Sequence, residues 1–296
     1  MSSSAAFTLT GVVKRYPGFT LGPIDLALEP GTVLGFVGPN GSGKTTTLNC
    51  IAGLVRPDAG SVAVFGRAVD QTAPAWKADV GVVGETHGFY RGTTAEANLR
   101  FLSSFLPEWS DARARRLAVR LGLPLGKKVE ELSKGQLAKL ALVAALAHGP
   151  RLLLLDEPTS GLDPVVRAEV LDVLWEVLED GEHAIFYSTH VLSDIARLAD
   201  ELVFLREGGI LLRSSKDALT ERWRRISFRL ADADVAVAHA VEYRRVRAEH
   251  QVVSDDGDAT LAHLRELGAD AIEQSRMTID EIAVAILRGG NHVATP

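Results

Sequence analysis

The sequence contains a single cysteine and lacks any long apolar run. Because Cys50 has no second cysteine to pair with, no intrachain disulfide can form, which suits a reducing cytosol. No stretch reaches the ~20 apolar residues that a helix needs to cross a bilayer. The Ser/Ala-rich start, Met1 to Ala6, is short and does not have the features of a secretory signal. We therefore expect a cytoplasmic protein for which any membrane role comes through a partner.

An excess of positive charge is also missing. Lys and Arg total 32 against 38 Asp and Glu, which gives a net charge of -6 and a pI of about 5.8. This balance does not imply a general affinity for nucleic acid. Two arginine groups keep a weak nucleic-acid interpretation open: Arg222, Arg224, Arg225 and Arg229, and Arg244, Arg245 and Arg247. The length of 296 residues allows one large domain, or a large domain with a small one.

A glycine-rich segment, Gly38 to Thr45, is the feature around which the chain is organised. It follows an apolar run that predicts a buried strand, Val33–Val37, and precedes a predicted helix, Thr46–Ala52. This strand–loop–helix context is typical of a P-loop, whose backbone N–H groups surround phosphates. Lys44 would reach the β- and γ-phosphates, and the Thr45 hydroxyl would ligate Mg²⁺. The alternative is a glycine-rich turn that binds no nucleotide.

The predicted nucleotide-binding residues of this segment and its continuation are Gly38, Pro39, Asn40, Gly41, Ser42, Gly43, Lys44, Thr45 and Thr46.

Two carboxylates follow a second buried strand. The continuous apolar run Leu152–Leu155 is typical of a strand covered on both faces, and Asp156 and Glu157 come directly after it. In P-loop proteins an acid at this position holds Mg²⁺, which we assign to Asp156. Glu157 would then lie where it could polarise an attacking water. Taken alone, the pair could also be two acids that cap a strand end.

Alternating strands and helices predict a parallel α/β core. A helical block from about residue 93 to 148 interrupts this alternation and is predicted to be an insertion. From about Ser214 the signals weaken, and we expect a small α/β appendage. Its predicted strands and helices are Ile226–Leu230, Glu242–Arg247, Gln251–Ser254, Ala259–Leu267 and Ile279–Leu287.

Three further segments complete the pattern. Leu132-Ser133-Lys134-Gly135-Gln136 opens a predicted buried helix, with Ser133 as a good N-cap. On composition alone this could be only a capped helix start. The loop Ser160-Gly161-Leu162-Asp163 follows the two carboxylates, and His190 ends the next predicted strand.

In this order the motifs resemble those of the ATP-binding cassette (ABC) ATPases over about Phe7 to Arg213. The segment 132–136 matches the signature that separates this family from other P-loop ATPases. The resemblance implies a P-loop NTPase with a RecA-like parallel core, an antiparallel β subdomain and an inserted helical subdomain of about 93–148. The ATP-binding domain would span 7–213 and the small C-terminal appendage 214–296.

The resemblance also implies a mechanism that uses ATP and Mg²⁺. Two cassettes would pair head to tail, and each ATP would lie between the P-loop of one and the signature of the other. Ser133 and Gly135 would contact the γ-phosphate across that interface, and Asp163 would carry communication between the sites. Glu157 would be the general base or position the water, and His190 would contact the γ-phosphate. We expect the second cassette to come from another chain, giving a homodimer.

One aromatic residue and two departures complete the expected site. The family places an adenine-stacking aromatic ahead of the P-loop, which predicts this role for Tyr16; the alternative is a tyrosine that packs in a turn. Where the family usually has glutamine, this chain has Glu85, whose carboxylate can still ligate Mg²⁺. Where many members have glycine, it has Lys134.

The stretch from Gly84 through Leu99 resembles bacterial drug-export cassettes whose permease is a separate chain. Phe89, Tyr90 and Trp109 are candidates for the groove that receives the permease, or else ordinary core aromatics. The leading hypothesis is the ATPase subunit of an exporter, held on the inner face of the cell membrane by its permease, with no nucleic-acid partner. The alternatives are a soluble ABC ATPase acting on ribosomes or nucleic acid, and a catalytically dead cassette.

Overall fold

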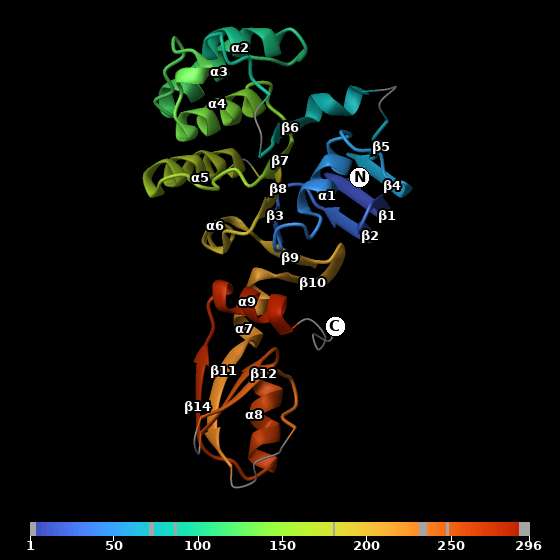
Figure 1. Ribbon diagram of the computed structural model, residues 1–296, viewed down its shortest axis with the longest axis vertical. Coiled ribbons are helices and arrows are strands. Elements are labelled where there is room, and N and C mark those ends of the chain that lie inside the picture. Colours follow the sequence, from blue (N-terminus) through green and yellow to red (C-terminus); the bar gives the residue numbers. More distant parts are fainter. Residues whose placement is uncertain are drawn as a thin grey trace.

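The computed structural model describes residues 4–70, 74–85, 88–179, 181–230, 236–246 and 249–289. It is elongated, with a helical group at one end, two sheets in the middle and a third sheet at the other end (Figure 1). Within this described part of the chain, no helix combines the length and the apolar character needed to span a bilayer.

The central sheet has the strand order β10-β9-β3-β8-β7-β6. Strands β3, β6, β7, β8 and β9 run parallel, and β10 pairs antiparallel with β9. Their bounds are β3 Val33–Val37, β6 Val80–Val83, β7 Leu152–Asp156, β8 Ala184–Thr189, β9 Glu201–Arg206 and β10 Gly209–Ser215. Because the register pairs Val37 with Thr189 and Asp156 with Ser188, the strands end together at one edge.

A four-stranded antiparallel sheet, ordered β2-β1-β4-β5, packs beside the central sheet (Figure 1). It is built from β1 Phe7–Tyr16, β2 Phe19–Leu28, β4 Ala59–Val64 and β5 Arg67–Ala68. Phe7 of this sheet meets Phe186 of β8 edge-on, with ring centroids 5.7 Å apart. This shared apolar core also holds α1 (Lys44–Ile51), and it fixes β1 and β2 next to the glycine-rich loop.

The block from about residue 93 to 148 is helical, as predicted. It contains α2 Ala95–Ser103, α3 Asp111–Arg120, the short 3₁₀ turn η2 Val129–Glu131 and α4 Lys134–Leu146. Thr94 and Ser110 cap α2 and α3 with side-chain hydrogen bonds to the backbone, which satisfies amides that have no partner within the helix. A second 3₁₀ turn, η1 (Pro74–Asp79), precedes β6, and α5 (Pro164–Leu178) and α6 (Leu192–Leu198) cover the central sheet.

The third sheet, ordered β12-β13-β11-β14, lies at the far end with α8 against one face (Figure 1). Its elements are α7 Lys216–Arg222, β11 Arg224–Arg229, β12 Ala240–Val246, β13 Glu249–Ser254, α8 Gly257–Glu266, β14 Asp270–Arg276 and α9 Ile279–Gly289. The predicted strand 242–247 is present within β12, except that Arg247 lies outside the described residues. The sequence did not predict α7 or β14.

Helix α9 contacts both the third sheet and the central sheet: it packs against β12, and its Glu281 pairs with Arg225 of β11 at 2.9 Å. Its buried residues Ile282 and Ile286 belong to the same apolar cluster as Ile195 of α6 and Phe204 of β9. The apolar face of α9 therefore packs against α6 and β9, and this contact ties the C-terminal part of the chain to the central sheet.

Candidate nucleotide-binding site

The glycine-rich loop connects β3 to α1 at the edge where the parallel strands end. Gly41 and Gly43 have φ values of 79° and 111°, a region that other residues adopt only with strain. Lys44 is the first residue of α1, and its ammonium donates to the main-chain oxygens of Gly38 (2.8 Å) and Pro39 (3.3 Å). The first turn of α1 contains no acidic residue, so the positive end of the helix dipole is not offset by a carboxylate.

The same loop contains an unsatisfied hydroxyl. Ser42 is 2% exposed, and its Oγ has no hydrogen-bond partner among the described residues. A buried polar atom without a partner is costly, so such atoms concentrate where a ligand serves them. Together with Lys44 and the dipole of α1, this cradle fits the phosphates of a nucleotide.

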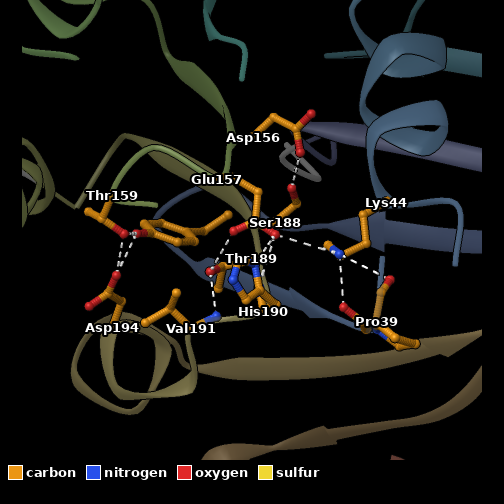
Figure 2. Close-up of polar contacts among 12 residues, drawn as sticks. Pro39, Lys44, Asp156, Glu157, Thr159, Ser188, Thr189, His190, Val191 and Asp194 are labelled. Carbon is orange, nitrogen blue, oxygen red and sulfur yellow. Dashed lines mark hydrogen bonds and ion pairs between the residues drawn. The ribbon is translucent and has the colours of Figure 1, made fainter. Parts of the chain in front are cut away.

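Glu157 lies at the centre of the polar contacts (Figure 2). Its Oε1 accepts a hydrogen bond from the main-chain N–H of His190 (3.0 Å), and its Oε2 accepts one from Thr189 Oγ1 (3.2 Å). Oε1 also lies 2.8 Å from His190 Nδ1 and 3.6 Å from Lys44 Nζ. Because an ionised carboxylate only accepts hydrogen bonds, Nδ1 is the donor of the ring contact. These contacts hold the carboxylate between the P-loop lysine and the turn at His190.

The backbone of Glu157 is strained, with φ of 50°. A positive φ in a residue other than glycine costs on the order of 1–3 kcal/mol and is tolerated where the surroundings fix it. Here the Glu157 amide donates to the Ser188 carbonyl oxygen at 3.0 Å. The adjacent Asp156, 2% exposed, accepts a hydrogen bond from Ser188 Oγ. The strain therefore directs two consecutive carboxylates to different positions.

A cleft of about 670 Å³ joins these parts. Tyr16 and Glu85 line it together with Glu157 and His190, as does most of the glycine-rich loop. The remaining lining residues are Phe19, Asn40, Gly41, Gly43, Lys44, Thr45, Thr46 and Ser160. Tyr16 is 41% exposed, so one face of its ring is available for a base. The sequence prediction did not include Phe19, which sits just after a turn, or Ser160 as a nucleotide contact.

The donors near the loop also fit Mg²⁺. Thr45, Asp156 and Glu85 offer only oxygen atoms, the ligands that Mg²⁺ prefers. No group of three or more His, Cys, Asp or Glu among the described residues could hold a metal by itself. Mg²⁺ is commonly bound by one or two carboxylates and by the phosphates of its substrate, so this sparse donor set is compatible with it.

Seven predicted site residues do not line the cleft. Gly38, Pro39 and Ser42 belong to the glycine-rich loop itself and Asp156 adjoins Glu157, whereas Ser133, Gly135 and Asp163 lie elsewhere. Ser133 caps α4: its Oγ accepts a hydrogen bond from Gln136 N at 3.2 Å, and its main-chain N–H donates to Gln136 Oε1 at 3.1 Å. Gly135 is buried, and a Cβ there would lie 3.1 Å from Val166. Asp163 caps α5 by accepting hydrogen bonds from the two amides at Val165 and Val166, both at 3.1 Å. These last three lie at helix N-termini and are outside the cleft of their own chain.

Lys134 reaches the loop 160–163 of the same chain. A Cβ placed on Gly161 would lie only 2.4 Å from Lys134 Nζ, so the ammonium packs directly over this glycine. The departure at Lys134 therefore extends toward the neighbouring loop and leaves the cap at Ser133 intact.

A second, apolar cleft of about 430 Å³ lies between the central sheet and the helical block. Phe89 lines it, with Trp76, Leu102 and Leu106. The other two candidate aromatics do not line it. Tyr90 packs edge-on against Phe101 with centroids 5.2 Å apart, and Trp109 Nε1 donates to Asp111 Oδ1 at 2.9 Å. Sequence periodicity could not separate these roles, because all three aromatics lie in or beside short irregular segments.

Known proteins that are similar to this chain are ATP-binding proteins of ABC transporters. A family model described as "ABC transporter" matches residues 21–160. The chain is 34% identical over 234 residues to the "probable multidrug ABC transporter ATP-binding protein YbhF" of Escherichia coli (strain K12), covering 76% of this chain and 40% of that protein. It is 30% identical over 248 residues to the "bacitracin transport ATP-binding protein BcrA" of Bacillus licheniformis, covering 83% of this chain and 81% of that one. A solved "ATP binding subunit of ABC transporter" superposes with a TM-score of 0.66 at 26% identity, over 73% of this chain and 92% of that chain.

Proposed function

Because the chain belongs to the ABC transporter family of ATP-binding proteins, we propose that it binds ATP with Mg²⁺ in the cleft beside the P-loop and hydrolyses the γ-phosphate. The observation that carries this proposal is the placement of Glu157. Its carboxylate is held by His190 at 2.8 Å and lies 3.6 Å from Lys44, the P-loop lysine. A fixed base beside a phosphate-binding cation is the arrangement that hydrolysis of a phosphoanhydride requires.

The residues in and beside the cleft have separate parts in this reaction. Tyr16 stacks on the adenine ring, and Lys44 with the loop amides binds the phosphates. Thr45, Asp156 and Glu85 would hold Mg²⁺, which would neutralise charge on the phosphates. Glu157 accepts a proton from the attacking water.

His190 fixes the orientation of Glu157 by donating to it through both its ring and its main chain. A base that is held in one geometry gains most of its effect from orientation, so His190 supports catalysis without itself accepting the proton. His190 also lines the cleft, where its ring would contact the γ-phosphate.

A second cassette completes the site. Ser133, Gly135 and Asp163 lie outside the cleft of their own chain, at the N-termini of α4 and α5. Helix N-termini attract anions, so they are suited to receive a γ-phosphate presented by a partner. The proposed assembly is a homodimer in which ATP joins the P-loop of one chain to the signature of the other.

The transported cargo crosses the membrane through another chain. The apolar cleft lined by Phe89 and Leu102 is the proposed seat of a cytoplasmic helix of a separate permease, which places the cassette on the inner face of the cell membrane. Export is favoured because YbhF and BcrA are named for multidrug and bacitracin transport. Since the chain spans 40% of the length of YbhF, the activity of that whole protein is extended here only as a proposal.

The domain organisation follows the same proposal. Residues 7–213 form the ATP-binding domain, with the helical subdomain at about 93–148, and residues 214–296 form the small appendage. The third sheet and its own apolar cluster around Ile226, Phe228 and Val252 support this division.

Two measurements test the proposal. Purified protein should release phosphate from ATP in a Mg²⁺-dependent manner; absence of release from folded protein would refute the ATPase. Tagged chain should recover a multi-spanning membrane protein from detergent extracts, and Leu102→Asp in the apolar cleft should abolish that recovery while ATPase activity persists. Recovery with ribosomes or DNA, and with no membrane protein, would favour the soluble alternative.

A further inference from the structure

A buried polar cluster lies directly behind the proposed catalytic groups. Thr159, Tyr187 and Asp194 are 3%, 1% and 1% exposed. Asp194 Oδ2 accepts a hydrogen bond from Tyr187 Oη at 3.1 Å and another from Thr159 Oγ1, whose oxygen lies 2.9 Å from Tyr187 Oη. Figure 2 shows Thr159 and Asp194 beside the Glu157–His190 contact, on the side away from Lys44. None of the three lines the nucleotide cleft.

The second oxygen of the same carboxylate reaches a different helix. Asp194 Oδ1 accepts from Arg167 Nε and forms an ion pair with its terminal nitrogen, which also donates to Ser193 Oγ. Arg167 belongs to α5 and is about one helical turn beyond Asp163, to whose carbonyl its amide is bonded at 3.0 Å. One carboxylate therefore divides its two oxygens between two groups of partners.

These partners come from the segments that the reaction uses. Thr159 stands between Glu157 and the loop 160–163, while Tyr187 is on β8, the strand that leads into His190. Asp194 itself is in the first turn of α6, the helix that follows His190. Through Asp194, the turn that contains His190 is thus bonded to both ends of the loop 160–163.

Burial makes this cluster restrictive. A carboxylate removed from water must be fully paired, because an unpaired buried charge is strongly destabilising. Asp194 meets this requirement only when α5, α6 and Thr159 hold their present positions. Burial, and then the charge of Asp194, raise the pKa of Tyr187 well above its usual value, so the phenol stays protonated and remains a donor. A fully satisfied network of this kind specifies one arrangement of the segments that it joins.

We infer that Asp194 is a positioning residue for ATP hydrolysis, which makes the His190 turn and the loop 160–163 move as one unit. This inference rests on the proposed ATPase activity and adds to it. Asp194 contacts no substrate and acts through the groups that do: His190 beside Glu157 in one chain, and Asp163 at the surface offered to the second chain. When ATP binds between the two chains, a shift of the loop 160–163 would then move the catalytic carboxylate through this buried hydrogen-bond network.

The chain offers a matched control for this inference. Asp172 of α5 pairs with Arg197 of α6 at 3.0 Å, so it links the same two helices with the same kind of ion pair. That pair is on the surface, with side chains 45% and 50% exposed, and has no contact with Thr159 or Tyr187. Asp172→Asn therefore removes an inter-helix ion pair without touching the buried network.

The decisive experiment compares steady-state ATP hydrolysis by the full chain, Asp194→Asn and Asp172→Asn. Displacing catalytic groups by a fraction of an ångström lowers turnover without removing substrate contacts, so Asp194→Asn should reduce kcat about 10- to 100-fold. Its KM for ATP should stay within about 2-fold of the parent value, and Asp172→Asn should leave both constants unchanged. Equal kcat values for the two variants, or a loss expressed in KM, would overturn the inference.

A second pair of variants keeps the test informative if Asp194→Asn does not fold. Thr159→Val removes the hydroxyl with little change in shape, and Thr159→Ser restores it. Valine should lower kcat in the same way and serine should recover most of it; equal activity of the two would contradict the inference. Were the parent chain itself inactive while folded and able to bind ATP, the proposed ATPase would fail, which is a different result.

Discussion

Glu157 receives two hydrogen bonds from a single residue, one from the main-chain N–H of His190 at 3.0 Å and one from its ring Nδ1 at 2.8 Å. Both donors reach Oε1, and Thr189 Oγ1 donates to Oε2 at 3.2 Å, so the three bonds together fix the position and the rotation of the carboxylate. The base is therefore oriented by the protein before a water molecule reaches it, which is where a general base gains most of its advantage.

Replacing Glu157 with Gln should lower the rate of phosphate release about 10²- to 10⁴-fold, because the amide cannot accept the proton of the attacking water. Nucleotide binding should persist, and the ATP-bound dimer should accumulate and be detectable by size-exclusion chromatography. Glu176→Gln is the control: this carboxylate is 49% exposed and pairs with Arg120 on the surface. A Glu157→Gln protein that hydrolyses ATP at the parent rate would remove Glu157 from the reaction.

Replacing Tyr16 with Ala should weaken ATP binding by about 1–3 kcal/mol, the usual contribution of an aromatic ring stacked on a base. The loss should appear in KM or in the equilibrium dissociation constant and leave kcat unchanged, since the proposed role of Tyr16 is to bind the base and not to take part in the reaction. Tyr16→Phe should restore binding. Tyr90→Ala, a comparable exposed tyrosine outside the cleft, should have no effect; if it weakens binding equally, the stacking assignment is wrong.

Replacing Ser133 with Ala should remove the N-cap of α4 and reduce the free energy of unfolding by about 1 kcal/mol in urea titrations. Ser110 caps α3 in the same way, because its Oγ accepts a hydrogen bond from Arg113 N at 3.2 Å. Ser110→Ala should therefore reduce the free energy of unfolding by a similar amount. Only Ser133→Ala should also weaken ATP-dependent dimerisation. If both variants dimerise alike, Ser133 has a structural role alone.

Burial raises the pKa of the Cys50 thiol to about 11 from 9.0. Because the folded state binds the proton more tightly, this contribution to stability is complete below pH 9 and is lost as the pH rises toward 11. The urea midpoint should fall over that interval, and Cys50→Ala should show a smaller fall. A thiol reagent at pH 8 should react only as fast as the protein unfolds; rapid labelling of native protein would contradict the assigned burial.

Much of the fold could be predicted because its signals are local. The runs Val33–Val37 and Leu152–Leu155 are apolar throughout, so they predict fully covered strands, and the strands begin and end within a residue of prediction. Strand β14, Asp270–Arg276, could not be predicted. It is an exposed edge strand, so its sequence does not alternate between apolar and polar residues. Strand β14 is held by backbone hydrogen bonds to β11, and such bonds do not depend on the side chains of β14.

The site divides in the same way. The glycine-rich loop and the carboxylates at the end of β7 are each a continuous segment, so the sequence alone could predict their chemistry. The contacts of Asp194 join residues from separate elements, and no spacing rule connects Thr159 with Asp194. These polar residues come together only in the folded structure, so the sequence did not predict the buried network around Asp194.

The packing of α9 against α6 has a consequence for how the chain responds to truncation. Ile282 and Ile286 of the last helix are fully buried in one cluster with Ile195, in the helix that follows His190. A fragment ending at Arg213 keeps every motif of the family but exposes this apolar patch to water, at roughly 1.5–3 kcal/mol for each large side chain uncovered. Proteolytic loss of α9 would therefore leave the motifs in place and destabilise α6, the helix that follows the histidine turn.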